Sequence, residues 1–114
     1  MITILHTESS TGWGGQEIRI IQEALGLKKR GYRIFIIAEE KSEILKKSQQ
    51  LEFDTFPIRF SKYNPLSFLK INSLIKRLNI DIVNTHSSKD SWVTILASQL
   101  LSKKPKIIRT RHLS

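Results

Sequence analysis

The feature that most constrains the fold is a regular alternation of short apolar runs with longer amphipathic stretches. Between the apolar runs, residues with apolar side chains recur at helical spacing, beginning near Gln16, after Ser42, at Leu66 and at Trp92. Strands that alternate with helices at this spacing predict βαβ units, with parallel strands and helices on both faces of one sheet. The five runs rich in β-branched residues, read as strands, are 1–6, 33–38, 54–58, 81–85 and 106–110.

Local signals agree with this division of the chain. Gly31 follows three basic residues and suits the position just after a helix, while Ser42 suits a helix N-cap. Pro65 suits a first helical turn, and Pro57 places the third strand near a sheet edge. We therefore predict an α/β, Rossmann-like three-layer domain with about five parallel strands in the order 3-2-1-4-5.

This strand order predicts where a ligand binds. In open α/β sheets, ligands bind beyond the carboxyl ends of the strands, where the strand order reverses. Here the reversal falls between the first and fourth strands. The loops that meet there are 7–15 and 86–90, and the loop that starts at Arg111 lies beside them.

Composition narrows the class of protein. The 114 residues suit one domain, and 19 Lys and Arg against 10 Asp and Glu give a net charge of +9. That excess favours an anionic partner, although a solvated lysine-rich surface explains it equally well. The cations are dispersed, which argues against nucleic acid. There is no cysteine, no membrane-length apolar run and no signal-peptide pattern at the start, so we expect a cytoplasmic protein.

The loop TGWGGQEIRI, residues 11–20, stands between the first strand and the first helix. A helix N-terminus offers unpaired amides and the positive end of its dipole, and glycine lets an anion approach closely. Gly14 and Gly15 are therefore candidates for phosphate binding. The alternative is a tight strand-to-helix turn without a ligand.

A dinucleotide cofactor is a weaker interpretation of the same loop. Gly12 and Gly14 fit the first two positions of G-x-G-x-x-G, but Glu17 occupies the third. An acid after the second strand, Glu39 or Glu40, could still bind a ribose. Glu17 also suits a helix cap, and no G-K-[ST] follows, which excludes a P-loop.

Four segments together resemble the N-terminal domain of family 4 glycosyltransferases, which have the GT-B fold. "GWGGQE" resembles the family's G-G-x-E loop, and "DIVNTHSS" (81–88) its fourth strand and following loop. "IIRTRH" (107–112) resembles its fifth strand ending in T-x-H, and "LKKRGYRIFIIA" (27–38) its passage into the second strand. The resemblance covers the whole chain.

The resemblance implies an acceptor-side domain of a retaining enzyme that uses a nucleotide-sugar donor and no metal or other cofactor. It implies that Gly14 and Gly15 bind the donor diphosphate and that His112 is catalytic. The candidates for the acceptor site are His86, Trp13, Glu17 and Arg111. His6 ends the first strand, and we interpret it as structural.

The implied acceptor is a glycan or a lipid-linked molecule of cell-surface polysaccharide synthesis, reached at an anionic inner membrane face. Because the chain ends just after the fifth strand, we interpret residues 1–114 as an incomplete N-terminal domain without its donor-binding partner, inactive alone. Two alternatives stay open: a non-catalytic Rossmann-like module that binds a nucleotide or a partner, and a fragment of an NAD-dependent oxidoreductase.

Overall fold

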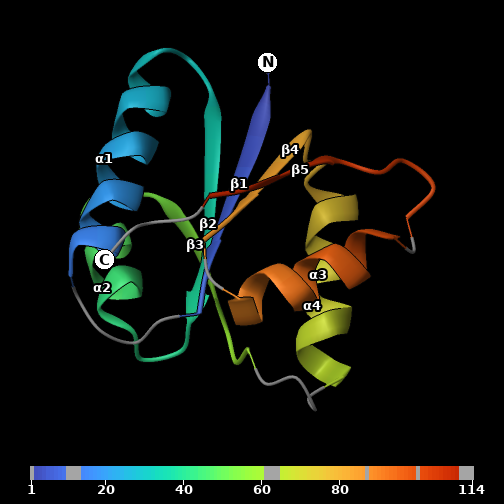
Figure 1. The fold of residues 1–114 in the computed structure, drawn as a ribbon. Coiled ribbons are helices and arrows are strands. Elements are labelled where there is room, and N and C mark those ends of the chain that lie inside the picture. The colour runs from blue at the N-terminus through green and yellow to red at the C-terminus, as the bar shows by residue number, and fades with distance from the viewer. Residues whose placement is uncertain (1, 10–13, 61–64, 87, 100, 111–114) are drawn as a thin grey trace.

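The computed structural model describes residues 2–9, 14–60, 65–86, 88–99 and 101–110. Within these ranges, strands and helices alternate from the first element to the last (Figure 1). The elements are β1 (Thr3–Glu8), α1 (Gly15–Lys29), β2 (Arg33–Glu39), α2 (Glu43–Gln50), β3 (Asp54–Ile58), α3 (Pro65–Arg77), β4 (Ile82–Thr85), α4 (Ser88–Gln99) and β5 (Lys106–Arg109).

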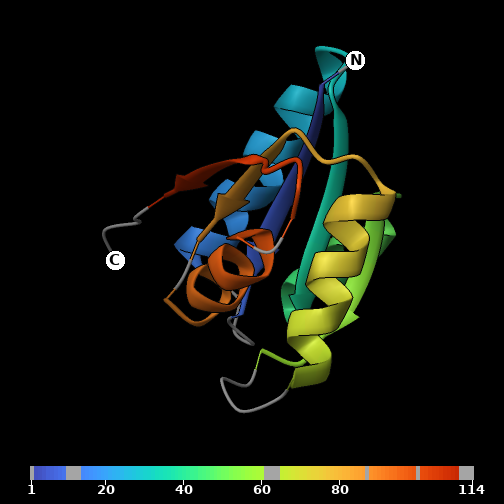
Figure 2. The same ribbon diagram turned by 90° about the vertical axis from the view of Figure 1, so that its right-hand side faces the viewer.

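The strands form one parallel sheet in the order β3-β2-β1-β4-β5, which confirms the predicted topology. β1 is central, and Leu5 pairs in register with Phe35 of β2 on one side and Val83 of β4 on the other. β3 and β5 form the edges (Figure 2). Pro57, which cannot donate to a ladder, lies in the edge strand β3 as expected.

The helices pack on the sheet through two apolar cores, one on each face. α1 and α2 cover one face and α3 and α4 the other (Figure 1). The α1–α2 core includes Ile4, Ile20, Ile21, Ala24, Ile34, Ile36, Ala38, Ile44, Leu45 and Phe53. The α3–α4 core includes Leu5, Phe35, Ile37, Ile58, Ile71, Leu74, Ile75, Val83, Val93 and Ala97.

Three of the helices end in the same way, with a left-handed residue that turns the chain into the next strand. After α1, Gly31 has φ +92°, its amide donates to Lys28 O, and Tyr32 N donates to Leu27 O. This is a Schellman motif, and Gly31 is the C′ residue that the sequence predicts. Glu52 and Asn79 take the same left-handed conformation after α2 and α3.

The structure differs from the sequence prediction at two boundaries. α4 begins at Ser88 rather than Trp92, so the polar segment predicted as a loop and cap supplies the first turn of the helix. β1 continues past His6 to Glu8, because Thr7 and Glu8 extend the ladder with β2. Polarity suggested loops in both places, but polar side chains are tolerated in a helix's first turn and at the carboxyl end of a strand that lines a site.

No helix in the described ranges is both long enough and apolar enough to cross a membrane.

Candidate functional site

The strand order reverses between β1 and β4, and the site is built at the carboxyl ends of these two strands. β1 leads through the glycine loop toward α1, whereas β4 leads to α4 on the opposite face of the sheet (Figure 1). Because α1 and α4 lie on opposite faces, neither connection crosses over the carboxyl ends of β1 and β4. This is the position where open α/β sheets bind ligands.

Alternate side chains of a strand lie on the same face of the sheet. At the ends of β1 and β4, one such set is polar and faces α1. Ile4 packs in the α1–α2 core, and His6 and Glu8 follow at steps of two on the same face of β1. By the same alternation, Asn84 and His86 follow Ile82, which packs against that core. We refer to His6, Glu8, Asn84 and His86 as the polar layer.

The two histidines of the polar layer contact each other directly. His6 Nδ1 lies 3.0 Å from His86 Nε2, within hydrogen-bond distance, and the rings stack with centroids 5.3 Å apart at 17°. Both side chains are buried, with His6 only 1% exposed. Burial disfavours the charged form and lowers the pKa of His6 from 6.5 to about 4, so this imidazole is neutral at pH 7.

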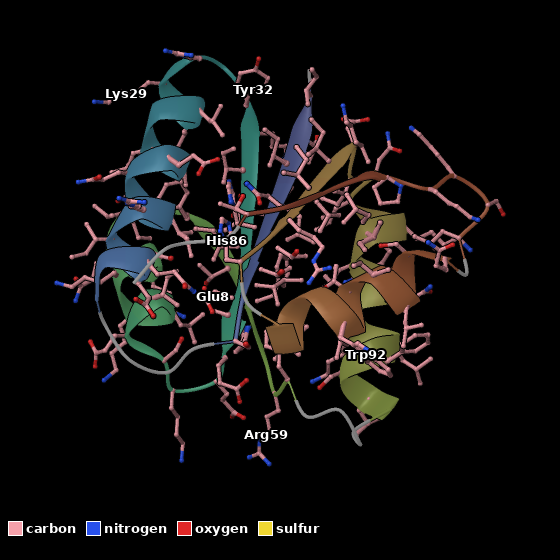
Figure 3. All side chains as sticks on the ribbon, in the orientation of Figure 1. Glu8, Lys29, Tyr32, Arg59, His86 and Trp92 are labelled. Carbon is pink, nitrogen blue, oxygen red and sulfur yellow. The ribbon has the colours of Figure 1, made fainter. Side chains whose placement is uncertain are left out.

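The remaining members of the polar layer connect it to α1 and β5. Gln16 Nε2 in the first turn of α1 donates to Glu8 Oε2. Asn84 Nδ2 donates to Glu23 Oε1 of α1 at 3.3 Å, and Thr110 Oγ1 donates to Asn84 Oδ1 at 2.7 Å. The layer therefore joins β1, β4, α1 and the residue after β5. Figure 3 places Glu8 and His86 in this region, between α1 and the sheet.

The N-terminus of α1 is partly capped by its own first turn. Glu17 is buried, and its Oε2 accepts from Gly14 N at 2.9 Å. Glu17 thus has the helix-cap role that its position in the first turn predicts, and its carboxylate occupies the Gly14 amide. A phosphate would bind that amide only after displacing the carboxylate. Gly15 is exposed, and a Cβ on it would meet no atom within 4 Å.

The predicted site residues are only partly within the described ranges. Gly14, Gly15 and Glu17 lie together at the start of α1, and His86 lies in the polar layer. His112, Arg111 and Trp13 lie outside the described residues.

The sequence does not single out Glu8, and it gives no sign of the contact that His6 makes. The sequence predicts a loop at Glu8, yet this residue is 1% exposed and hydrogen-bonded to α1. The sequence predicts a structural role for His6, and the structure places this residue in contact with His86, which follows β4. The signal available in the sequence was the step of two from Ile4, which puts both residues on the α1 face once β1 is extended to Glu8.

Both acids considered for a ribose, Glu39 and Glu40, have partners in the structure. Glu39 Oε2 accepts from Phe60 N at 2.8 Å, and Glu40 forms an ion pair with Arg59 at 2.7 Å, so both candidate ribose acids are engaged. Within the described part of the chain, no three His, Cys, Asp or Glu residues cluster as metal ligands would.

Solved structures place this architecture among the GT-B glycosyltransferases. A glycosyltransferase from Rickettsia africae ESF-5 superposes with a TM-score of 0.77 at 27% identity, over 95% of this chain and 29% of its own. MurG from Acinetobacter baumannii superposes with a TM-score of 0.78 at 14% identity, over 97% of this chain and 35% of its own. At that identity the MurG match speaks for the fold alone.

The sequence profile of glycosyltransferase family 4 matches residues 13–114, and the chain belongs to that family. No curated protein matches the sequence significantly. The chain spans about a third of the length of the two solved relatives.

Proposed function

We propose that this chain is the acceptor-side domain of a retaining glycosyltransferase. The enzyme would transfer a sugar from a nucleotide-sugar donor to a glycan or lipid-linked acceptor in cell-surface polysaccharide synthesis. The observation that carries the proposal is the family 4 match over residues 13–114. The supporting geometry is a helix N-terminus and a buried polar layer that meet at the strand-order reversal.

The chemistry of transfer suits the start of α1. When a nucleotide-sugar bond breaks, negative charge develops on the leaving diphosphate, and amides at a helix N-terminus stabilise such charge without reorganising. In the proposal, Gly15 offers its backbone to the phosphate directly. Gly14 joins when the phosphate replaces the Glu17 carboxylate, which is then released toward the acceptor side.

The acceptor side of the proposal centres on His86. An imidazole can donate to or accept from a sugar hydroxyl, and the contact of His86 with His6 fixes how its ring lies. Trp13 and Arg111 stay predicted acceptor contacts, and His112 stays the predicted catalytic residue near the transferred sugar.

The proposal also includes a cytoplasmic enzyme in peripheral contact with an anionic membrane face. A net charge of +9 supports it, since a lysine or arginine near an anionic surface contributes about 1 kcal/mol.

The test is a Gly15→Val variant of the full-length protein, with Gly26→Ala as the matched control in the same helix. A Cβ at either glycine meets no atom within 4 Å, so both variants should fold. We expect Gly15→Val to lower kcat/KM about 10-fold to 100-fold, because valine shields the amides from the diphosphate. Turnover with a panel of nucleotide-sugars gives the measurement. An unchanged rate in Gly15→Val would remove the phosphate role.

The 114-residue chain by itself should give no turnover in the same assay. One wall of a two-domain cleft supplies only part of the contacts to donor and acceptor. Detectable sugar transfer by the purified chain would overturn this part of the proposal.

A further inference from the structure

The chain leaves β5 with little packing to hold it in place. β5 is an edge strand of four residues, and among the described strands it pairs only with β4 (Figure 2). Its last two residues face solvent, with Ile108 40% exposed and Arg109 exposed as well. A strand end with few buried apolar contacts opens locally at a small cost in free energy. The direction in which the chain leaves β5 therefore depends on hydrogen bonds rather than on the apolar cores.

Two hydrogen bonds join Thr110, the first residue after β5, to β4. The Thr110 amide donates to Thr85 O at 2.9 Å and continues the ladder, and Thr110 Oγ1 donates to Asn84 Oδ1 at 2.7 Å. The register explains the second bond. Asn84 pairs with Ile108, so Thr110, two residues further on, lies on the same face of the sheet as Asn84. Both the backbone and the side chain of Thr110 are thus held by β4.

The orientation of the Asn84 amide is set from the other side, by α1. Asn84 Nδ2 donates to Glu23 Oε1 at 3.3 Å. An ionised carboxylate accepts and does not donate, so the amide nitrogen faces Glu23 and the amide oxygen faces Thr110. The Thr110 hydroxyl is then the donor in its bond to Asn84. The amide of Asn84 cannot turn over without losing both bonds.

The choice of a polar residue at position 84 needs a reason other than stability. Ile82, two residues earlier on the same face of β4, packs against the α1–α2 core. Asn84 is only 6% exposed, and burying its amide has a desolvation cost that an apolar side chain avoids. The hydrogen bond to Thr110 is directional, and an apolar residue could not supply it. Asn84 therefore fixes the end of β5 in one geometry.

We propose that Asn84 is a positioning residue for sugar transfer. Through Thr110 it fixes the course of the chain directly before Arg111 and His112, the predicted acceptor contact and the predicted catalytic residue. The inference rests on the proposed function, which gives His112 its role. Asn84 acts through Thr110 and does not touch the substrate. A rotation of the backbone at Thr110 would displace His112, and a displacement of about 1 Å can lower a rate about 100-fold.

The first test is steady-state kinetics of the full-length protein with valine or serine at position 110. Valine keeps the shape of threonine without the hydroxyl, whereas serine keeps the hydroxyl. We expect Thr110→Val to lower kcat about 10-fold to 100-fold, with KM for donor and acceptor within about twofold of wild type. Thr110→Ser should keep kcat within about threefold of wild type, since its hydroxyl can still donate to Asn84. An unchanged kcat in Thr110→Val, or an equal loss in Thr110→Ser, would overturn the proposal.

A double variant separates positioning from stability. Thr110→Val takes away the donor to the buried Asn84 Oδ1 and should lower the urea midpoint of unfolding. Asn84→Leu/Thr110→Val replaces both polar groups by apolar ones, so the midpoint should return toward the wild-type value. We expect kcat of the double variant to stay as low as that of Thr110→Val. If kcat recovered together with stability, the contact would be structural and the proposal would fall.

Thr94→Val is the matched control, because it makes the same substitution in α4. Thr94 Oγ1 is buried and has no hydrogen-bond partner among the described residues. This variant should keep the wild-type kcat and KM. A loss of kcat equal to that of Thr110→Val would show that removing any buried hydroxyl slows the enzyme, which would contradict a specific role for the contact with Asn84.

Hydrogen exchange at the residue 110 amide tests the same contact without turnover. In the full-length protein, Thr110→Val should lower the protection factor of this amide about tenfold, and Thr110→Ser should keep it. An unchanged protection factor in Thr110→Val would mean that Asn84 does not fix the end of β5. If the wild type transferred no sugar with any donor and acceptor, the proposed function would fall and the role in transfer with it. Faster exchange in Thr110→Val would still sustain the part of Asn84 in fixing the end of β5.

Discussion

The hydrogen bond between His6 and His86 restricts where each ring carries its proton. His6 is neutral at pH 7, so it holds one ring proton. Its Nε2 is buried and has no hydrogen-bond partner among the described residues. Orphaned buried N–H groups are rarer than unpaired acceptors, so the proton belongs on Nδ1 and is donated to His86 Nε2. His86 must then carry its own proton on Nδ1.

Ring nitrogen shifts in a long-range ¹H–¹⁵N spectrum test this assignment. We expect an unprotonated Nε2 on His86 in the wild type. His6→Asn, whose amide can still donate from near the Nδ1 position, should keep that pattern, and His6→Leu should lose it. A protonated Nε2 in the wild type would reverse the direction of the bond.

The buried His6 also predicts how stability changes with pH. Because its folded pKa is about 4 and the unfolded value is 6.5, the unfolded chain binds more protons between these values. Stability therefore falls as pH drops through this window, by about 2 kcal/mol between pH 8 and pH 5 from this residue. Urea unfolding at both pH values measures it. His6→Asn should flatten the pH dependence by that amount, and an unchanged difference would contradict the assignment.

At the scale of the element, a glycine inside α1 and a glycine just after it have opposite requirements. Gly26 is exposed within the helix and a Cβ there meets no atom within 4 Å, whereas Gly31 at the C′ position has φ +92°. Gly26→Ala should stabilise the protein by about 0.5–1 kcal/mol, because alanine has the higher helix propensity. Gly31→Ala should destabilise it by about 1–2 kcal/mol, because the left-handed conformation strains a side chain.

Thermal or urea unfolding of the two variants checks the signs. If the two substitutions changed the free energy of unfolding equally, the left-handed conformation of Gly31 would not be what disfavours a side chain there.

The start of α1 shows how one element serves both stability and the candidate site. Glu17 satisfies the Gly14 amide and places a carboxylate on the helix dipole, which stabilises the helix without a ligand. An anion can therefore bind the Gly14 amide only by replacing the Glu17 carboxylate. Glu17→Gln, which can still accept from Gly14 N, separates the cap from the charge.

At the scale of the whole molecule, the same sheet forms one side of both apolar cores. The α1–α2 core and the α3–α4 core should therefore unfold in one transition. Ile44 lies in the α1–α2 core and Ile71 in the α3–α4 core, and both are fully buried. Ile44→Ala and Ile71→Ala should each lower the free energy of unfolding by about 2–5 kcal/mol. Circular dichroism and tryptophan fluorescence should report one coincident transition in each variant. Separate transitions for the two faces would contradict a single cooperative unit.

The sequence by itself determined the element order, the sheet topology, the N-cap of α2 and the C′ residue of α1. Local rules sufficed because each signal acts within a few residues: β-branched runs for strands, helical stripes, Ser42 as an N-cap, Gly31 as a C′ residue. The parallel order followed from the handedness of crossovers. The same reasoning predicts a ligand site at the strand-order reversal with Gly14 and Gly15 beside it, and the family resemblance adds His86 as a predicted acceptor contact.

Only the tertiary structure decided how the site is assembled. The pairing of His6 with His86 joins residues 80 apart in the chain, and depends on β1 and β4 being neighbours in one register. Glu8 became part of the site because its strand continues past the point where polarity suggested a loop. Such contacts depend on long-range packing, which desolvates a polar side chain and fixes its partner. No pattern confined to neighbouring residues encodes that information.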